Sequence, residues 1–132
     1  MAGELEAIVR KVFDAVDRKD VDVLNLLSDD DIQGVDGVSR KWLRGRDAAD
    51  EHWRRGLTAV DDIRTELGDF SETTFGEAGL VTYWMEQDYT LDGNAEHVSG
   101  PATAVFRRRG DEWKAVLLFH SVLSAEESAQ LT

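Results

Sequence analysis

The stretch that decides the fold is Thr103-Ala104-Val105-Phe106-Arg107-Arg108-Arg109-Gly110-Asp111-Glu112-Trp113-Lys114-Ala115-Val116-Leu117-Leu118-Phe119-His120-Ser121. Two apolar segments flank Gly110-Asp111, a pair suited to a two-residue hairpin turn. The second segment, Ala115 to Phe119, has no polar residue, whereas a strand with one wet face alternates polar and apolar side chains. We therefore expect both faces of this strand to be covered, one by a core or pocket and the other by a partner subunit.

The first half of the chain predicts helices. Apolar residues recur at helical spacing from about residue 4 to residue 18, and Asp20 can cap a second, shorter helix. Two short strands, 32–36 and 40–43, are expected around Gly37. A third helix is predicted over 46–59, with a buried stripe made of Ala49, Trp53, Leu57 and Val60.

The second half predicts a sheet. Gly68 is expected to mark a bulge that bends one strand. Long strands follow over 80–91, 95–109 (interrupted at Gly100-Pro101) and 112–123, and a helical turn over 126–131 is capped by Ser124 with Glu127. Helices followed by a meander of strands indicate an α+β fold, a cone-shaped curved antiparallel sheet wrapped around N-terminal helices. The interior of such a cone is a natural cavity for a small molecule.

Composition excludes several classes of protein. The chain has 132 residues, 42% of them hydrophobic, which suits one folded domain over residues 1–132. It has no cysteine and a net charge of −12, which disfavours binding to nucleic acid or to anionic membranes. Arg107-Arg108-Arg109 is the exception and is interpreted as a solvated strand end. Neither a signal peptide nor a membrane span is predicted, so a cytoplasmic location is expected.

Three stretches resemble the SnoaL-like group of the nuclear-transport-factor-2-like superfamily. They are Leu43-Arg44-Gly45-Arg46-Asp47-Ala48 at the start of the third helix, the hairpin from Thr103 to Trp113, and Ser121 eight residues after Trp113. The resemblance implies a single SnoaL-like domain of cystatin-like fold. Relatives include ketosteroid isomerase, polyketide cyclases and the association domains of calmodulin-dependent kinases.

The chain departs from the group's pattern at two positions. The family histidine lies six residues after the tryptophan, whereas here that position is Phe119 and His120 follows it. A step of one residue turns a side chain to the other face of a sheet. Pro101 stands where the family often has an arginine, so an arginine that binds an anion there is missing.

Two residues are the candidate catalytic groups. His120 lies in an apolar strand, where a desolvated imidazole can transfer protons near neutral pH. Asp88, on the strand over 80–91, is the best candidate for a carboxylate base. The alternation of that strand leaves two possibilities open. If the odd-numbered face lines the cone, the pocket contains Tyr83, Met85, Gln87 and Tyr89 and no acid; if the even-numbered face does, it contains Trp84, Glu86 and Asp88.

Trp42 and Trp53 bracket the Gly-Arg motif and are candidates for the pocket wall. His52, His97 and His120 show no metal-ligand spacing, so no metal site is predicted, and no nucleotide motif is present. The leading hypothesis is a protein that binds a small molecule and catalyses an isomerase or cyclase step on an apolar, oxygenated substrate without a cofactor. The alternative is a non-catalytic dimerisation or interaction module. In either case we expect a homodimer through the sheet face.

Overall fold

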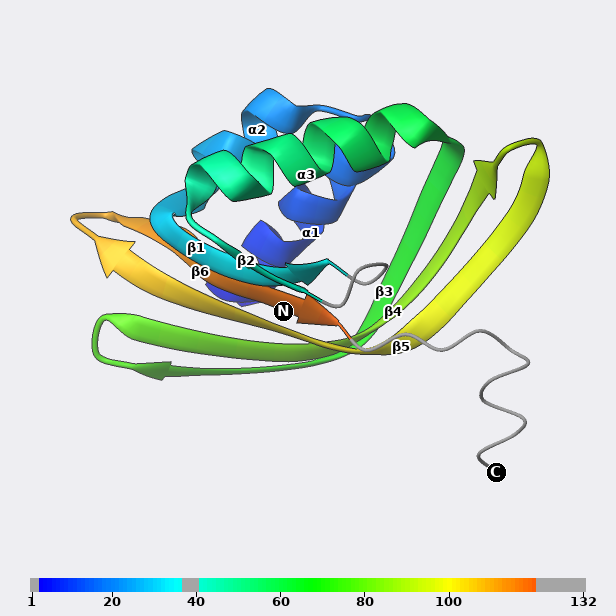
Figure 1. Ribbon diagram of the computed structural model, residues 1–132. Coiled ribbons are helices and arrows are strands. Elements are labelled where there is room, and N and C mark those ends of the chain that lie inside the picture. Colours follow the sequence, from blue (N-terminus) through cyan, green and yellow to red (C-terminus); the bar gives the residue numbers. More distant parts are fainter. Residues whose placement is uncertain (1–2, 37–40, 121–132) are drawn as a thin grey trace.

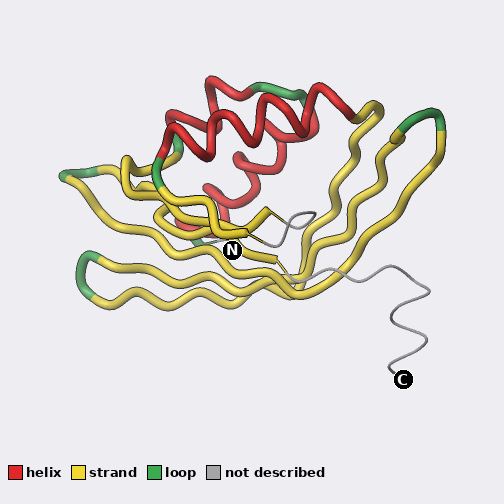
Figure 2. The backbone as a smooth tube through the Cα atoms, in the orientation of Figure 1, coloured by secondary structure: helices red, strands yellow, loops and turns green. Residues whose placement is uncertain are grey.

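The computed structural model describes residues 3–36 and 41–120. Within them, three helices and six strands follow one another: α1 (Glu4–Asp17), α2 (Val21–Leu26), β1 (Ser28–Asp36), β2 (Lys41–Arg44), α3 (Arg46–Ala59), β3 (Val60–Phe75), β4 (Ala78–Leu91), β5 (Asn94–Arg109) and β6 (Glu112–His120). The strands form one sheet in the order β2-β1-β6-β5-β4-β3. The sheet curves around the helices, which all lie on its concave face, and it does not close (Figure 1; Figure 2). The predicted α+β fold is confirmed.

Strand pairing differs from the prediction in one respect. Strands β1 and β6 are parallel, whereas the other neighbouring strands are antiparallel, so the sheet is mixed. The long stretch of chain between β1 and β6 allows this, because only adjacent strands joined by a tight turn must run antiparallel. Strand β5 is also continuous through Pro101, where an interruption was expected. The predicted loop at Gly37, Ser121 and the helical turn over 126–131 lie outside the described residues.

Helix α1 begins against β3. Its N-cap, Gly3, has no side chain to accept the first free N–H groups of the helix. The carboxylate of Glu72 takes that role, since it accepts hydrogen bonds from the N–H groups of Leu5 and Glu6 at 3.3 and 3.0 Å. A Cβ at position 3 would collide with this carboxylate, so glycine allows the close approach. The contact holds the start of α1 on the concave face of the sheet.

The curvature of the sheet comes from irregularities in β3. The register between β3 and β4 shifts between Asp61 and Arg64 and again between Gly68 and Ser71. Asp62 and Asp69 have positive φ angles of 52°, a conformation that aspartate tolerates better than most residues. The bulge predicted at Gly68 therefore lies at the following residue. Bulges bend a strand and increase its twist, which lets the sheet wrap around the helices.

Strand β6 contains another bulge. Ala115 lies opposite Phe106 and Leu117 lies opposite Val105, so Val116 is an extra residue with no partner on β5. Because side chains alternate between the two faces of a strand, an extra residue exchanges the faces of all the residues that follow it.

This exchange decides which residues at the end of β6 face the helices. Trp113, before the bulge, is buried on the inner face. His120, after the bulge, lies opposite Ala102, which is also buried on that face. Strict alternation from Trp113 would have turned Phe119 inward and His120 outward. The bulge therefore gives the inner face a histidine.

A buried carboxylate joins β1 to β5. The side chain of Asp29 has no exposed surface, and it binds Nη2 of Arg107 at 2.5 Å and Nε of Arg109 at 2.7 Å. Burial alone would raise the pKa of Asp29, but hydrogen bonds from Arg109, the N–H of Asp31 and Arg107 outweigh it and hold the pKa far below its usual range. Two of the three arginines predicted as a solvated strand end thus neutralise an internal charge.

The core lies between the inner face of the sheet and α1. It includes Leu5 and Val9 of the helix, and Val81, Phe106 and Trp113 of the strands. No helix within the described residues has the length and hydropathy needed to cross a membrane.

Replacement of Trp113 tests this core. Trp113 is 8% exposed, so we expect Trp113→Ala to lower the free energy of unfolding by about 3–5 kcal/mol, the usual cost of truncating a buried tryptophan to alanine. Trp42 is 54% exposed, so the control Trp42→Ala should cost less than roughly 1 kcal/mol. Denaturant unfolding followed by circular dichroism measures both. Equal losses in the two variants would show that Trp113 is peripheral to the core.

Candidate functional site

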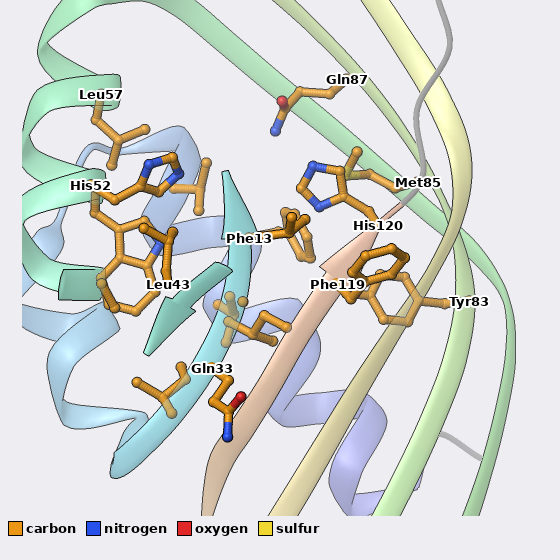
Figure 3. A pocket seen from close by; sticks show the side chains of 18 residues that line it. Phe13, Gln33, Leu43, His52, Leu57, Tyr83, Met85, Gln87, Phe119 and His120 are labelled. Atoms are coloured by element: carbon orange, nitrogen blue, oxygen red, sulfur yellow. The ribbon is translucent and has the colours of Figure 1, made fainter. Parts of the chain in front are cut away.

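A cavity of about 180 Å³ lies between the helices and the inner face of the sheet. Helices α1 and α3, strands β1, β2 and β4, and the end of β6 all contribute residues to its wall (Figure 3). Most of these are apolar: Val12, Phe13, Val16, Ile32, Val35, Leu43, Ala49, Trp53, Leu57, Met85, Leu118 and Phe119. The polar residues that line it are Gln33, His52, Tyr83, Gln87 and His120. Gln33 lies opposite Leu117, on the outer-face register of the sheet.

Strand β4 presents its odd-numbered side chains to the cavity. Tyr83 and Met85 are buried and Gln87 lines the wall next to them. This is the first of the two alternatives left open by the sequence, the one without an acid. Among the described residues that line the cavity there is no Asp, Glu, Lys or Arg. The wall can therefore form hydrogen bonds but carries no permanent charge.

The imidazole of His120 lines the cavity at its rim, where part of the residue stays exposed. Burial lowers the pKa of His120, and the nearby His52 lowers it further. Figure 3 shows the two rings on opposite sides of the cavity, His52 on α3 and His120 on β6. Nδ1 of His52 is 3.9 Å from a carboxylate oxygen of Asp36. At neutral pH, His120 is therefore an uncharged imidazole that can accept a proton.

Tyr83 sits deeper in the wall. Its ring stacks on Phe70 with the centroids 5.5 Å apart, and meets Phe13 edge-on at 6.0 Å. Burial raises the pKa of Tyr83 well above that of an ordinary phenol. The phenol therefore stays protonated and is available as a hydrogen-bond donor.

Gln87 is held by a chain of hydrogen bonds that leads away from the cavity. Its Nε2 donates to Oγ1 of Thr65 on β3 at 3.0 Å. The hydroxyl of Thr65 in turn donates to Oδ1 of Asp17 at 2.6 Å, and the N–H of Thr65 donates to Oδ2 at 3.0 Å. Asp17 is the last residue of α1, so this chain joins the helix, β3 and β4 beside the cavity.

Asp88 lies on the other face of the sheet. Its Oδ1 is 2.6 Å from Nδ1 of His97 on β5, whose Nε2 is 3.3 Å from Glu86. These side chains are exposed, and hydrogen bonding to Asp88 is the main cause of the raised pKa of His97. The structure thus separates Asp88 from His120, because even-numbered side chains of β4 point away from the helices.

Two of the aromatic residues predicted for the pocket also lie outside the cavity wall. Trp42 is exposed at the edge of the sheet on β2, 6.5 Å from the ring of Phe119. Tyr89 lies beyond Gln87, where burial and the charge of Glu96 raise its pKa. The other predicted pocket residues, Trp53, Tyr83, Met85 and Gln87, are all in the wall.

The sequence favoured independent histidines, whereas His52 and His120 both line this cavity. A signal for it was available, because His52 follows Ala49 by three residues and so shares the face of α3 predicted to be buried. Nothing in the sequence pointed to the contact of Thr65 with Asp17, which are 48 residues apart. Within the described residues, no group of three or more His, Cys, Asp or Glu side chains could hold a metal ion.

Comparison with known proteins assigns the family. The profile of the SnoaL-like domain matches residues 5–125. The chain belongs to the SnoaL-like family. No curated protein matches this SnoaL-like sequence.

Solved structures share the fold of this SnoaL-like chain at low sequence identity. A proposed dehydratase of the NTF2-like family from Streptomyces avermitilis is 20% identical, with a TM-score of 0.83 over 92% of this chain and 96% of that one. A protein with a cystatin-like fold from Caulobacter vibrioides is 18% identical, with a TM-score of 0.80 over 96% and 92%. The CaMKII hub of S. rosetta is 16% identical, with a TM-score of 0.76 over 93% and 99%. At these identities the likeness shows the fold alone.

Proposed function

We propose that this SnoaL-like protein binds a small, uncharged, largely apolar molecule that carries an oxygen function. The observation that supports it is the cavity of about 180 Å³, whose described wall is apolar apart from a few hydrogen-bonding groups and contains no Asp, Glu, Lys or Arg. An engineered apolar cavity of roughly 150 Å³ is enough to bind benzene. The cavity therefore suits a molecule of one ring with small substituents.

The charge of the ligand follows from the wall. An ion transferred from water into an apolar cavity loses its hydration and needs a countercharge. The described wall supplies none. The surface is strongly acidic as well, with a net charge of −12, and it repels anions before they reach the rim.

The chemistry that fits this site is proton transfer by His120. In a β,γ-unsaturated ketone, a neutral imidazole can take the proton from the carbon between the carbonyl group and the C=C bond and return it to the far end of that bond, so that the double bond moves into conjugation; this is an isomerisation. The protonated phenol of Tyr83 is the donor available to the carbonyl oxygen. Such a step uses His120 alone as the base, without Asp88, and requires neither metal nor organic cofactor.

Binding is tested with p-cresol as the probe and benzoate as its charged counterpart. We expect p-cresol to shift the indole N–H signal of Trp53 in NMR spectra, because Trp53 lines the cavity, and we expect benzoate to bind at least tenfold more weakly. Leu57→Trp should weaken the binding of p-cresol by a similar factor, because the larger side chain fills the cavity from α3. Leu26→Trp is the matched control, since Leu26 is 67% exposed on α2. Equal binding of p-cresol to both variants would contradict this site.

Proton transfer is tested with cyclohexanone in D₂O, by the loss of its α-proton NMR signal. We expect His120→Gln to slow the protein-dependent exchange roughly 100-fold or more. The wild-type rate should rise with pH through the pKa of His120, which burial lowers from that of an ordinary imidazole, and level off near neutrality because the neutral imidazole is the base. His97→Gln, on the opposite face, should match the wild type. Unchanged exchange in His120→Gln would exclude His120 as the base.

A second proposal concerns assembly: the protein forms a homodimer through the outer face of the sheet. Cross-strand neighbours Leu80, Val105 and Leu117 form an apolar row there, and Trp84, further along β4 on the same face, is 42% exposed. The helices lie on the other face (Figure 1). Apolar side chains gathered on an open sheet face are typical of protein interfaces. The structural neighbour from S. rosetta is a hub, which favours an assembly role for this fold.

Sedimentation at micromolar concentration tests the dimer. We expect the mass of two chains for the wild type, and the mass of one chain for Trp84→Glu, because a carboxylate in the middle of an apolar interface stays unpaired. Leu26→Glu, a charge added at an exposed site on α2, should remain dimeric. A monomeric wild type would rule out the interface.

A further inference from the structure

A groove between α1 and β3 adjoins the cavity. Its lining consists of Phe13 together with Arg10, Asp14, Asp17, Thr65, Glu66 and Leu67. Among the described residues, Phe13 is the one that lines both the groove and the cavity. Thr65, in the groove, lies opposite Gln87, in the cavity wall, and Leu67 and Met85 form the next such pair. The two spaces therefore lie side by side over the inner face of the sheet, and Phe13 stands where they meet.

The ring of Phe13 has a defined position. It meets the ring of Tyr83 edge-on with the centroids 6.0 Å apart, and Tyr83 stacks on Phe70 at 5.5 Å. Both are favourable geometries for aromatic pairs. Phe13 also packs against both clusters of buried apolar side chains in the core. Figure 3 shows it among the side chains that surround the cavity. A ring held in this way forms a fixed partition between the two spaces.

The two spaces differ in charge. The described wall of the cavity contains no Asp, Glu, Lys or Arg. The lining of the groove has the three carboxylates of Asp14, Asp17 and Glu66 and the single guanidinium of Arg10. A cationic group in the groove would therefore find countercharges. The same group held inside the cavity would lose its hydration without gaining one.

We propose that Phe13 is a specificity-determining residue whose ring closes the cavity towards the groove, so that a ligand cannot extend between α1 and β3. This inference rests on the proposed binding of a small uncharged molecule and names the residue that limits its length on this side. It also explains how an apolar site is kept apart from the carboxylates that lie next to it.

The test compares p-cresol with 4-(4-aminobutyl)phenol, in which a four-carbon chain ending in an ammonium group takes the place of the methyl group. The informative quantity is the ratio of the affinity for the amine to the affinity for p-cresol. We expect Phe13→Ala to raise this ratio about tenfold or more, because the ammonium group can then reach the carboxylates of the groove, and a hydrogen bond to a charged group contributes that much. Phe13→Val, a milder truncation, should raise it less.

Leu57→Ala is the matched control. Leu57 lines the cavity from α3 and does not line the groove, so its truncation adds space without opening this route. The affinity ratio should then stay within about twofold of the wild-type value, since added apolar space does not accommodate an ammonium ion. The shift of the Trp53 indole signal by p-cresol shows in each variant that the cavity is intact.

NMR spectra also show where the tail lies. Glu66 and Leu67 line the groove and not the cavity. In Phe13→Ala, the amine should shift the backbone amide signals of these two residues, whereas in the wild type it should leave them in place. Shifts of equal size in the wild type would show that the groove is already open to the ligand and would overturn the inference.

The outcomes distinguish the inference from the function on which it rests. If p-cresol binds the wild type but the affinity ratio is unchanged in Phe13→Ala and Phe13→Val, or rises equally in Leu57→Ala, closure by Phe13 is wrong and the binding function stands. If p-cresol does not bind the wild type, the proposed function is wrong and the inference falls with it. A rise confined to the variants at position 13, with shifts at Glu66 and Leu67, supports the inference.

Discussion

The site depends on a single extra residue in the last strand. Val116 has no partner on β5, and the residues after it exchange faces. Without this bulge, Phe119 would point at the helices, and His120 would lie on the outer face of the sheet. The cavity would then have a wholly apolar rim on that side. One inserted residue therefore decides whether the last strand contributes a group able to accept a proton to the cavity.

The cavity itself depends on curvature. The bulges at Asp62 and Asp69 bend β3 and the strands paired with it, so that the sheet surrounds α1 instead of lying flat against it (Figure 2). At one end the sheet contacts the helix, where Glu72 accepts the first N–H groups of α1 and Trp113 fills the core. Towards the other end α1 still meets β3, through Asp17 and Thr65, but a space remains between α1, α3 and β6. The same bending that packs the core thus leaves room for a ligand.

The sequence predicts well those features that depend on residues close together in the chain, and poorly those that depend on contacts between distant residues. The helices and the hairpin at Gly110-Asp111 follow local rules of periodicity, capping and turn chemistry, and they were predicted nearly to the residue. Which face of each strand turns towards the helices was harder to predict. The odd-numbered face of β4 could not be chosen in advance, because Tyr83 and Trp84 are equally suited to a core. The face of His120 could not be chosen at all, since nothing in the composition of an apolar strand marks where a bulge lies.

The charge distribution explains how a strongly acidic protein can have an uncharged site. The innermost carboxylate, Asp29, is neutralised by Arg107 and Arg109, and Asp88 is paired with His97 on the far face. Asp17, the carboxylate that holds Gln87, acts on the cavity through two hydrogen bonds rather than through its charge. An ionised group in the wall would favour a charged ligand, whereas a carboxylate two hydrogen bonds away only fixes which end of the Gln87 amide binds Thr65. Asp17 therefore holds the side chain of Gln87 beside the cavity without placing a charge in the wall, and the site stays suited to an uncharged molecule.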